Sequence, residues 1–155
     1  MSQEAENESA IKMLVKSADD ARMLSAFLQD GLVAHHDIHF DKARQEVMMV
    51  VDRYRWEKSA ERNERVLMGL RIGKVEALLQ KNMASPTQTG QGARFYNLLQ
   101  FAYEKGQDGK QALIFTFSAG AALRLVIGDL MMSAGDVAPP RPAIAKPTHD
   151  PIDDV

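Results

Sequence analysis

The densest group of side chains that could do chemistry is His35-His36-Asp37-x-His39-x-Asp41. Imidazole and carboxylate groups bind zinc, iron or nickel, and three of them with a water molecule make a catalytic metal site. We therefore take His35, His36, His39 and Asp41 as candidate ligands of a divalent transition metal, or as the groups of a histidine-based enzyme. The alternative is a helix end that carries histidines because cationic groups suit the negative end of the helix dipole. In the HExxH motif the i, i+4 spacing places both histidines on one face of a helix. The spacing in this group does not by itself bring the side chains together.

The stretch from Arg53 to Lys81 is the second such group, because it holds eight basic residues and four glutamates. A basic stripe is the electrostatic footprint of an anion-binding or RNA-binding surface. Four arginines are the candidates for this role: Arg53, Arg55, Arg65 and Arg71. Alternate residues of a strand point to opposite faces, so we expect Arg53 and Arg55 to meet solvent while Tyr54 and Trp56 enter the core. The interleaved glutamates favour cross-strand ion pairs as the other interpretation of these residues.

Methionine is the third residue type of interest, since the chain has nine, with neighbours at Met48–Met49 and Met131–Met132. The flexible thioether side chain suits an adaptable interface, and it also fills irregular gaps in a core. Both interpretations stay open from the sequence.

The composition narrows the chemistry further. The chain has 155 residues, no cysteine, 19 Lys+Arg, 21 Asp+Glu and a formal net charge of −2. The lack of cysteine excludes disulfide frameworks, cysteine-based zinc sites and thiol nucleophiles. The near-neutral balance is not that of a basic protein that coats nucleic acid. The sequence also lacks GxGxxG, GxxxxGK[ST] and GxSxG, so no common catalytic or phosphate-binding motif supports an enzyme.

The termini and hydropathy bear on location. The first ten residues contain three glutamates and no basic residue, which does not fit a secretory or transit signal. The longest weakly charged apolar run, 111–123, is shorter than the roughly 20 residues that a membrane-spanning helix needs. We therefore expect a cytoplasmic protein that has no membrane partner.

One helix is expected near the start of the chain. Residues 11–15 alternate in polarity like a strand, and Ser17 then offers a helix N-cap. Apolar residues follow at spacings of mostly three and four (Ala21, Leu24, Phe27, Leu28 and Leu32). This pattern predicts an amphipathic helix of roughly five turns that ends near His35–His36.

Beyond the helix the apolar residues recur every second residue, as in a strand, instead of about every 3.6 residues, as in a helix. Residues 38–40 and 46–56 predict a hairpin around the turn DKARQ, and further strands are expected at 66–72, 75–79, 95–103, 113–117, 122–127 and 130–133. In the strand at 95–103 we place Phe95, Leu99, Phe101 and Tyr103 on one face. The fold class is therefore α+β, with one N-terminal amphipathic helix packed on a curved, mainly antiparallel β-sheet or partial barrel.

The chain divides into three parts by composition. Residues 1–10 are expected to be a disordered acidic N-terminus, and residues 11–136 a single α+β domain. Five of the six prolines lie after residue 137. Proline lacks the donor that a sheet needs, so residues 137–155 are expected to be a Pro-rich extended or disordered tail.

Several segments resemble a family of bacterial domains. They are KMLVKSADDARMLSAFLQDGLV, the strand that ends in RYRWE, RVLMGLRI, and LIFTFSAGAALRLVIGDL. Together they are similar to an uncharacterised, mainly alphaproteobacterial family of domains of unknown function, over about residues 11–135. The resemblance implies no activity, cofactor or catalytic residue.

Three functional hypotheses follow from the residues. The preferred one is a non-enzymatic binding or assembly module that uses an open sheet edge or a methionine-rich face to pair with itself or with a protein partner. The second is an enzyme at the histidine group, and the third is anion or RNA binding through the arginines. The sequence requires no cofactor, and a divalent transition metal enters only with the second hypothesis.

Overall fold

The computed structural model describes residues 10–56, 63–83, 95–139 and 141–142. The prediction of a disordered N-terminus lies almost entirely outside these residues. So does most of the prediction for the tail. The first elements are β1 (Lys12–Val15), helix α2 (Ala18–Leu28), β2 (Gly31–Ala34), the 3₁₀ turn η1 (His35–Asp37), β3 (Ile38–Asp41), β4 (Glu46–Tyr54) and β5 (Glu64–Ile72). They are followed by β6 (Val75–Lys81), β7 (Phe95–Lys105), β8 (Gln111–Phe117), the 3₁₀ turn η2 (Ser118–Gly120), β9 (Ala122–Ile127), β10 (Met132–Asp136) and β11 (Arg141–Pro142).

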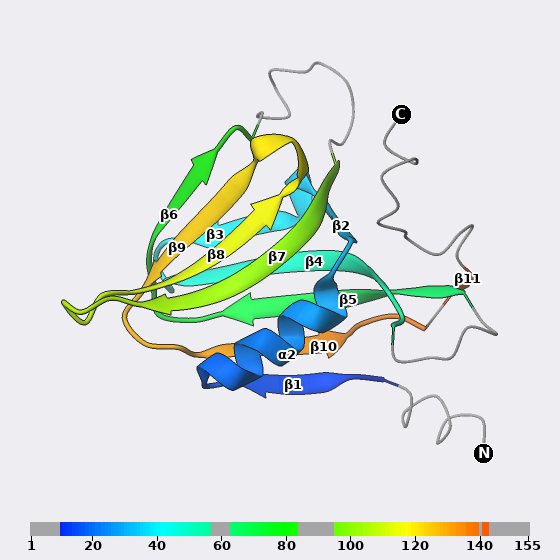
Figure 1. Cartoon of the computed structure of the whole chain (residues 1–155), viewed down its shortest axis with the longest axis horizontal. Helices are drawn as coiled ribbons and strands as arrows, with labels where there is room; N and C mark the ends of the chain where they lie inside the picture. Colours follow the sequence, from blue (N-terminus) through cyan, green and yellow to red (C-terminus); the bar gives the residue numbers. More distant parts are fainter. Residues whose placement is uncertain (1–9, 57–62, 84–94, 140, 143–155) are drawn as a thin grey trace.

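The strands form one sheet in the order β1-β10-β5-β4-β2-β7-β8-β9-β6. The short strand β3 pairs with β4 beside β2, and β11 pairs with β5. Within the described residues every pairing is antiparallel. The sheet folds over so that β7, β8, β9 and β6 lie above β4, β5, β10 and β1, and helix α2 lies along one side (Figure 1). The predicted α+β class and curved antiparallel sheet are confirmed, and the sheet is not closed into a barrel.

Helix α2 begins as predicted and ends earlier than predicted. Ser17 is the N-cap, and its hydroxyl accepts a hydrogen bond from the backbone N–H of Asp20. The last helical residue is Leu28, so the expected helix end near His35–His36 is wrong. Asp30 adopts a left-handed conformation (φ 62°), which turns the chain out of the helix. Gly31 then opens β2, where a Cβ would collide with Cγ1 of Val51 on β4. The helix therefore ends before Gly31, the residue at which β2 lies close against β4.

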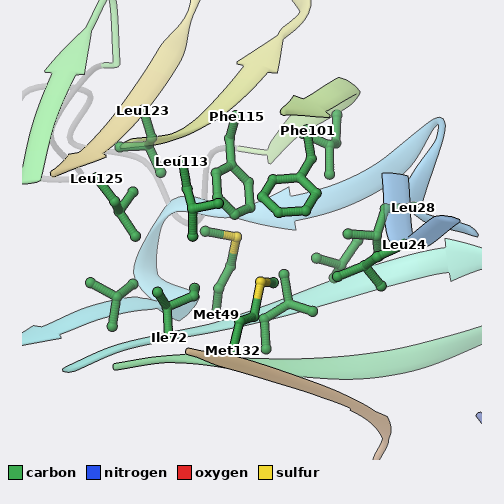
Figure 2. Close-up of a cluster of buried hydrophobic side chains, with 14 of the residues drawn as sticks. Leu24, Leu28, Met49, Ile72, Phe101, Leu113, Phe115, Leu123, Leu125 and Met132 are labelled. Atoms are coloured by element: carbon green, nitrogen blue, oxygen red, sulfur yellow. The ribbon is translucent and has the colours of Figure 1, made fainter. Parts of the chain in front are cut away.

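The hydrophobic core fills the space between the two halves of the folded sheet. Figure 2 shows side chains of β7, β8 and β9 above side chains of β4, β5 and β10, with the helix contributing from one side. Residues from the upper half include Phe101, Leu113, Phe115, Leu123 and Leu125. Residues from the lower half include Met49, Ile72 and Met132, and Leu24 and Leu28 come from the helix.

Strand β7 is present as predicted, but its residues do not keep one face throughout. Phe95 and Leu99 are exposed, whereas Leu98 and Phe101 are buried. The register against β8 shifts between Leu98 and Gln100, which marks a β-bulge. One extra residue exchanges the two faces of a strand, so the single face predicted for Phe95, Leu99, Phe101 and Tyr103 is wrong.

The sheet continues beyond residue 136. The backbone N–H of Val137 donates to the carbonyl of Leu67, and β11 pairs with the start of β5. No helix among the described residues is long and apolar enough to cross a membrane.

Candidate functional site

The four candidate metal ligands lie on η1 and β3. Nε2 of His36 is 3.7 Å from Oδ1 of Asp37, and His39 and Asp41 are exposed on β3. The ring of His35 lies against Tyr96 with 6.0 Å between centroids, and its Nδ1 atom is buried without a hydrogen bond. Within the described ranges, no group of three or more His, Asp or Glu side chains is close enough to hold a metal ion. The structure therefore does not bring the four residues together, and the metal site stays a prediction.

The four candidate anion-binding arginines are each in an ion pair. Arg53 on β4 contacts Asp136 on β10, with Nη2–Oδ2 at 2.8 Å and Nε–Oδ1 at 3.1 Å. Both side chains are buried, and the guanidinium carbon of Arg53 lies 5.9 Å from the centre of the Phe27 ring. Arg55 is also buried, with Nη1 at 2.8 Å from Oε1 of Glu64. The expectation that Arg53 and Arg55 meet solvent is therefore wrong: β4 keeps its alternation past Val51, which directs both side chains inward.

The other two arginines form ion pairs between β4 and β5. Nε of Arg65 is 3.3 Å from Oδ1 of Asp52, and its Nη2 atom donates to the carbonyl of Asp52 at 2.7 Å. Nε of Arg71 is 2.6 Å from Oε1 of Glu46. Of the interleaved glutamates, Glu64 forms the expected cross-strand ion pair with Arg55, whereas Arg65 and Arg71 pair with Asp52 and Glu46, which precede that stretch. Carboxylates hold all four guanidinium groups, and of the four side chains only Arg71 is largely exposed.

The two aromatic residues beside these arginines pack on each other. Tyr54 and Trp56 meet edge to face, with 4.7 Å between ring centroids and 64° between planes. The hydroxyl of Tyr54 donates to Oδ1 of Asn63, and Nε1 of Trp56 donates to the carbonyl of Gln29. These contacts tie the end of β4 to the end of the helix. They do not present the two rings as one flat stacking platform.

The two methionine pairs each contain one exposed and one buried residue. Met48 and Met131 are 44% and 53% exposed, whereas their neighbours Met49 and Met132 are 1% and 3% exposed. Because alternate strand residues point to opposite faces, each pair contributes one methionine to the core and one to the outside. The core interpretation is therefore confirmed for Met49 and Met132, and the interface interpretation stays a prediction for Met48 and Met131.

The outward-facing methionines belong to an apolar surface on the outside of β3, β4, β5, β10 and β1, which we call the methionine face. The strand register places five of its residues in one row across the strands: His39, Met48, Arg71, Ser133 and Leu14. The exposed apolar members of the face are Leu14, Met48, Met131 and Val137. The sequence contained the alternation that separates Met48 from Met49. It did not contain the strand order that places Leu14 and Met131 on the same outer face as Met48, with Arg71 and Ser133 between Met48 and Leu14.

Two glycines lie side by side near the centre of the methionine face. Gly69 on β5 is the register partner of Gly135 on β10, and the pairing on either side of them is regular. A Cβ on Gly135 would meet nothing closer than 3.9 Å, and one on Gly69 would contact Cγ1 of Val137 at 3.2 Å. A glycine inside a strand costs stability unless a bulge, a bend or a close approach explains it. Among the described residues no bulge is present here, and the side chain of Val137 approaches Gly69, so the two glycines form a shallow, half-buried stretch of backbone.

A pocket of about 460 Å³ opens at one end of the methionine face. Leu14, Leu130, Met131 and Met132 form its apolar part, and Gly73 and Ser133 also line it. The charged groups at its rim are Lys16, Glu46, Arg71 and Asp129. We call this cavity the end pocket; its size is in the range of sites for small ligands.

Comparisons with known proteins agree with the resemblance seen in the sequence. A family model described as "Protein of unknown function (DUF2948)" matches residues 11–149. This match begins where the folded domain was expected to begin and extends past β11. No curated protein and no solved structure matches the chain.

Proposed function

The chain belongs to the DUF2948 family of proteins of unknown function, and we propose that it is a non-enzymatic module that binds a protein partner through the methionine face. The observation that carries this proposal is that Leu14, Met48, Met131 and Val137 are all exposed on this one outer face of the sheet, where Arg71 and Ser133 lie between Met48 and Leu14. Exposed apolar side chains that gather on one face mark interaction sites, and methionine adapts to the shape of its partner.

The face supports the proposal better than the sheet edge does. The edge strand β1 has four residues, and exposed Lys12 and Lys16 stand at either end of Leu14. A short strand with lysines is a common protection against the addition of another strand. Edge strand β6 carries a register irregularity at Val75 and Ala77, which also disfavours strand addition. Of the two surfaces considered for the preferred hypothesis, the face is therefore the one we propose.

The size of the face indicates a transient partner. Four spacings of about 4.8 Å separate β3 from β1, and about six residues at 3.3 Å each span the other direction, so the face is roughly 20 Å by 20 Å. That flat area is about half of the roughly 800 Å² that each protein buries in a standard interface. An obligate homodimer needs more, so we propose a different protein that binds weakly and reversibly.

The charges on β1 indicate the chemistry of this partner. Lys12, Leu14 and Lys16 share the outer side of the strand, so a cation stands on each side of an apolar side chain. A partner with an apolar centre and acidic flanks would bury Leu14 and pair both lysines. We propose a cytoplasmic location for this encounter, because a chain without cysteine suits a reducing compartment.

The test is site-specific photocrosslinking in cells, with a photoreactive amino acid at position 48 and, as control, at position 79. Leu79 is 54% exposed on β6 and lies outside the methionine face. We expect a discrete adduct with another protein from position 48 that is absent from position 79 and is lost when Gly135→Lys is added. Equal adducts from both positions, an adduct that survives Gly135→Lys, or an adduct only with a second copy of the chain would contradict the proposal.

A further inference from the structure

We infer that the end pocket binds a small zwitterion with apolar side chains, of the kind represented by a dipeptide of two aliphatic residues. The pocket shares Leu14, Lys16 and Met131 with the surface proposed for the protein partner, so the two would compete, and the experiment below tests the pocket on the isolated chain. The inference rests on the combination of an apolar wall with charges of both signs at one rim.

The apolar wall comes from three segments that the fold brings together. Leu14 comes from β1, Leu130 and Met131 from the connection between β9 and β10, and Met132 from β10. Leu130 and Met132 are buried and fixed, whereas Leu14 and Met131 are exposed at the opening. Aliphatic side chains of a ligand would remove Leu14 and Met131 from water, which is the main favourable contribution to binding.

The charges determine which ligand class fits. Two of the four rim charges satisfy each other, because Nε of Arg71 is 2.6 Å from Oε1 of Glu46. The remaining two, Lys16 and Asp129, have opposite signs, and neither is in an ion pair within the described part of the chain. A simple anion would meet Asp129 and a simple cation would meet Lys16. A ligand with one carboxylate and one ammonium group can pair with both.

Local hydrogen bonds position the backbone at Lys16 and one carboxylate oxygen of Asp129. The N–H of Lys16 donates to Oδ2 of Asp20 at 3.0 Å, directly before the N-cap Ser17. Oδ1 of Asp129 accepts from the N–H of Leu130 at 2.9 Å, which leaves the other carboxylate oxygen for a ligand.

The experiment uses the full chain labelled with ¹³C in the methionine methyl groups. We titrate it with leucyl-leucine, N-acetyl-leucyl-leucine, leucyl-leucine amide and diglycine. Met131 and Met132 report on the pocket, and exposed Met23 on helix α2 is the internal control. We expect leucyl-leucine to shift the Met131 and Met132 signals and not the Met23 signal. Exposed ion pairs are worth about 0.2–1 kcal/mol, so blocking either terminus should weaken binding about 1.4- to fivefold. Diglycine should not bind.

Two variants assign the charges. Asp129→Asn keeps the acceptor for Leu130, and Lys16→Gln removes the positive charge and keeps a polar side chain. With Asp129→Asn, N-acetyl-leucyl-leucine should bind as well as leucyl-leucine does. With Lys16→Gln, leucyl-leucine amide should bind as well as leucyl-leucine does. Equal binding of all three leucine ligands, or equal shifts of Met23 and Met131, would overturn the inference. Because the ligand series is measured on the unaltered chain, its result does not depend on the folding of the variants or on any protein partner.

Discussion

Arg53 on β4 and Asp136 on β10 form a two-contact ion pair that crosses over β5 on the inner side of the sheet. Their side chains are 0% and 4% exposed. Asp136 also accepts from the N–H of Ile11 and donates its own N–H to the carbonyl of Ile11. One buried carboxylate therefore joins β4, β10 and the start of β1.

Removal of one partner of this pair should be strongly destabilising. Arg53→Met leaves a buried, uncompensated carboxylate, for which we expect a loss of about 3–5 kcal/mol in the free energy of unfolding. The double variant Arg53→Met/Asp136→Asn should lose less than the sum of the single variants, because no charge is then left unpaired. Urea denaturation measures all three. As a control, Arg71→Met removes an exposed pair and should cost less than about 1 kcal/mol. Strict additivity of the two buried substitutions would contradict the coupling.

This pair also shows where prediction from the sequence succeeds and fails. The alternation of β4 was visible, and it placed Arg53 opposite Tyr54. It could not show which face becomes the interior, because that depends on β10, 80 residues later in the chain. The charge of Arg53 alone predicts exposure, whereas the matching carboxylate of Asp136 allows the guanidinium group to be buried.

The predicted end of the helix is wrong because the helical spacing of apolar residues continues past the last helical residue. Leu32 falls at helical spacing after Leu28, so periodicity alone continues the helix. The left-handed Asp30 and the close approach of Gly31 to β4 are imposed by tertiary packing. Most strands and turns were predictable because alternation and glycine-rich turns are local features. The methionine face and the end pocket needed the strand order, which no local pattern contains.

A methyl group at Gly31 should test that close approach. Gly31→Ala would place Cβ against Cγ1 of Val51 and 3.0 Å from the carbonyl of Leu28, so we expect a loss of about 1–3 kcal/mol. Gly135→Ala is the matched control: its Cβ has room, and replacing a strand glycine should stabilise by about 0.5–1 kcal/mol. Thermal or urea unfolding gives both values. Equal effects of the two substitutions would show that packing at Gly31 is not what shapes the end of the helix.

The start of helix α2 should be sensitive to acid. The pKa of Asp20 is lowered from its usual 3.8, mainly because the backbone N–H of Lys16 donates to its carboxylate, with a further hydrogen bond from Ser17. A lowered pKa in the folded state means that the stabilisation is complete above about pH 3.8 and is lost as the pH falls through the lower folded value. An NMR titration of the Asp20 carboxyl carbon should therefore give a midpoint below 3.8. A midpoint at or above 3.8 would contradict the hydrogen-bonded start of the helix.

The histidine group should not act as one metal site. His36 contacts Asp37, His39 is exposed on β3, and His35 lies against Tyr96. We expect zinc to leave the thermal midpoint unchanged. His39→Ala serves as the comparison, since it removes the exposed member of the group. Stoichiometric zinc in the purified protein that disappears with His39→Ala would instead restore the hypothesis of a metal-dependent enzyme.

A single hydroxyl should fix the helix to the bulge of β7. Oγ of Ser25 accepts from the backbone N–H of Phe101 at 3.1 Å, just after the register shift between Leu98 and Gln100. Ser25→Ala leaves this N–H without a partner, so we expect a loss of about 1–3 kcal/mol and faster hydrogen exchange at the Phe101 amide. Ser25→Thr keeps a hydroxyl and should lose less, and Ser133→Ala on the outer face should stay within about 0.5 kcal/mol. Unchanged exchange at Phe101 in Ser25→Ala would mean that packing alone holds the helix on β7.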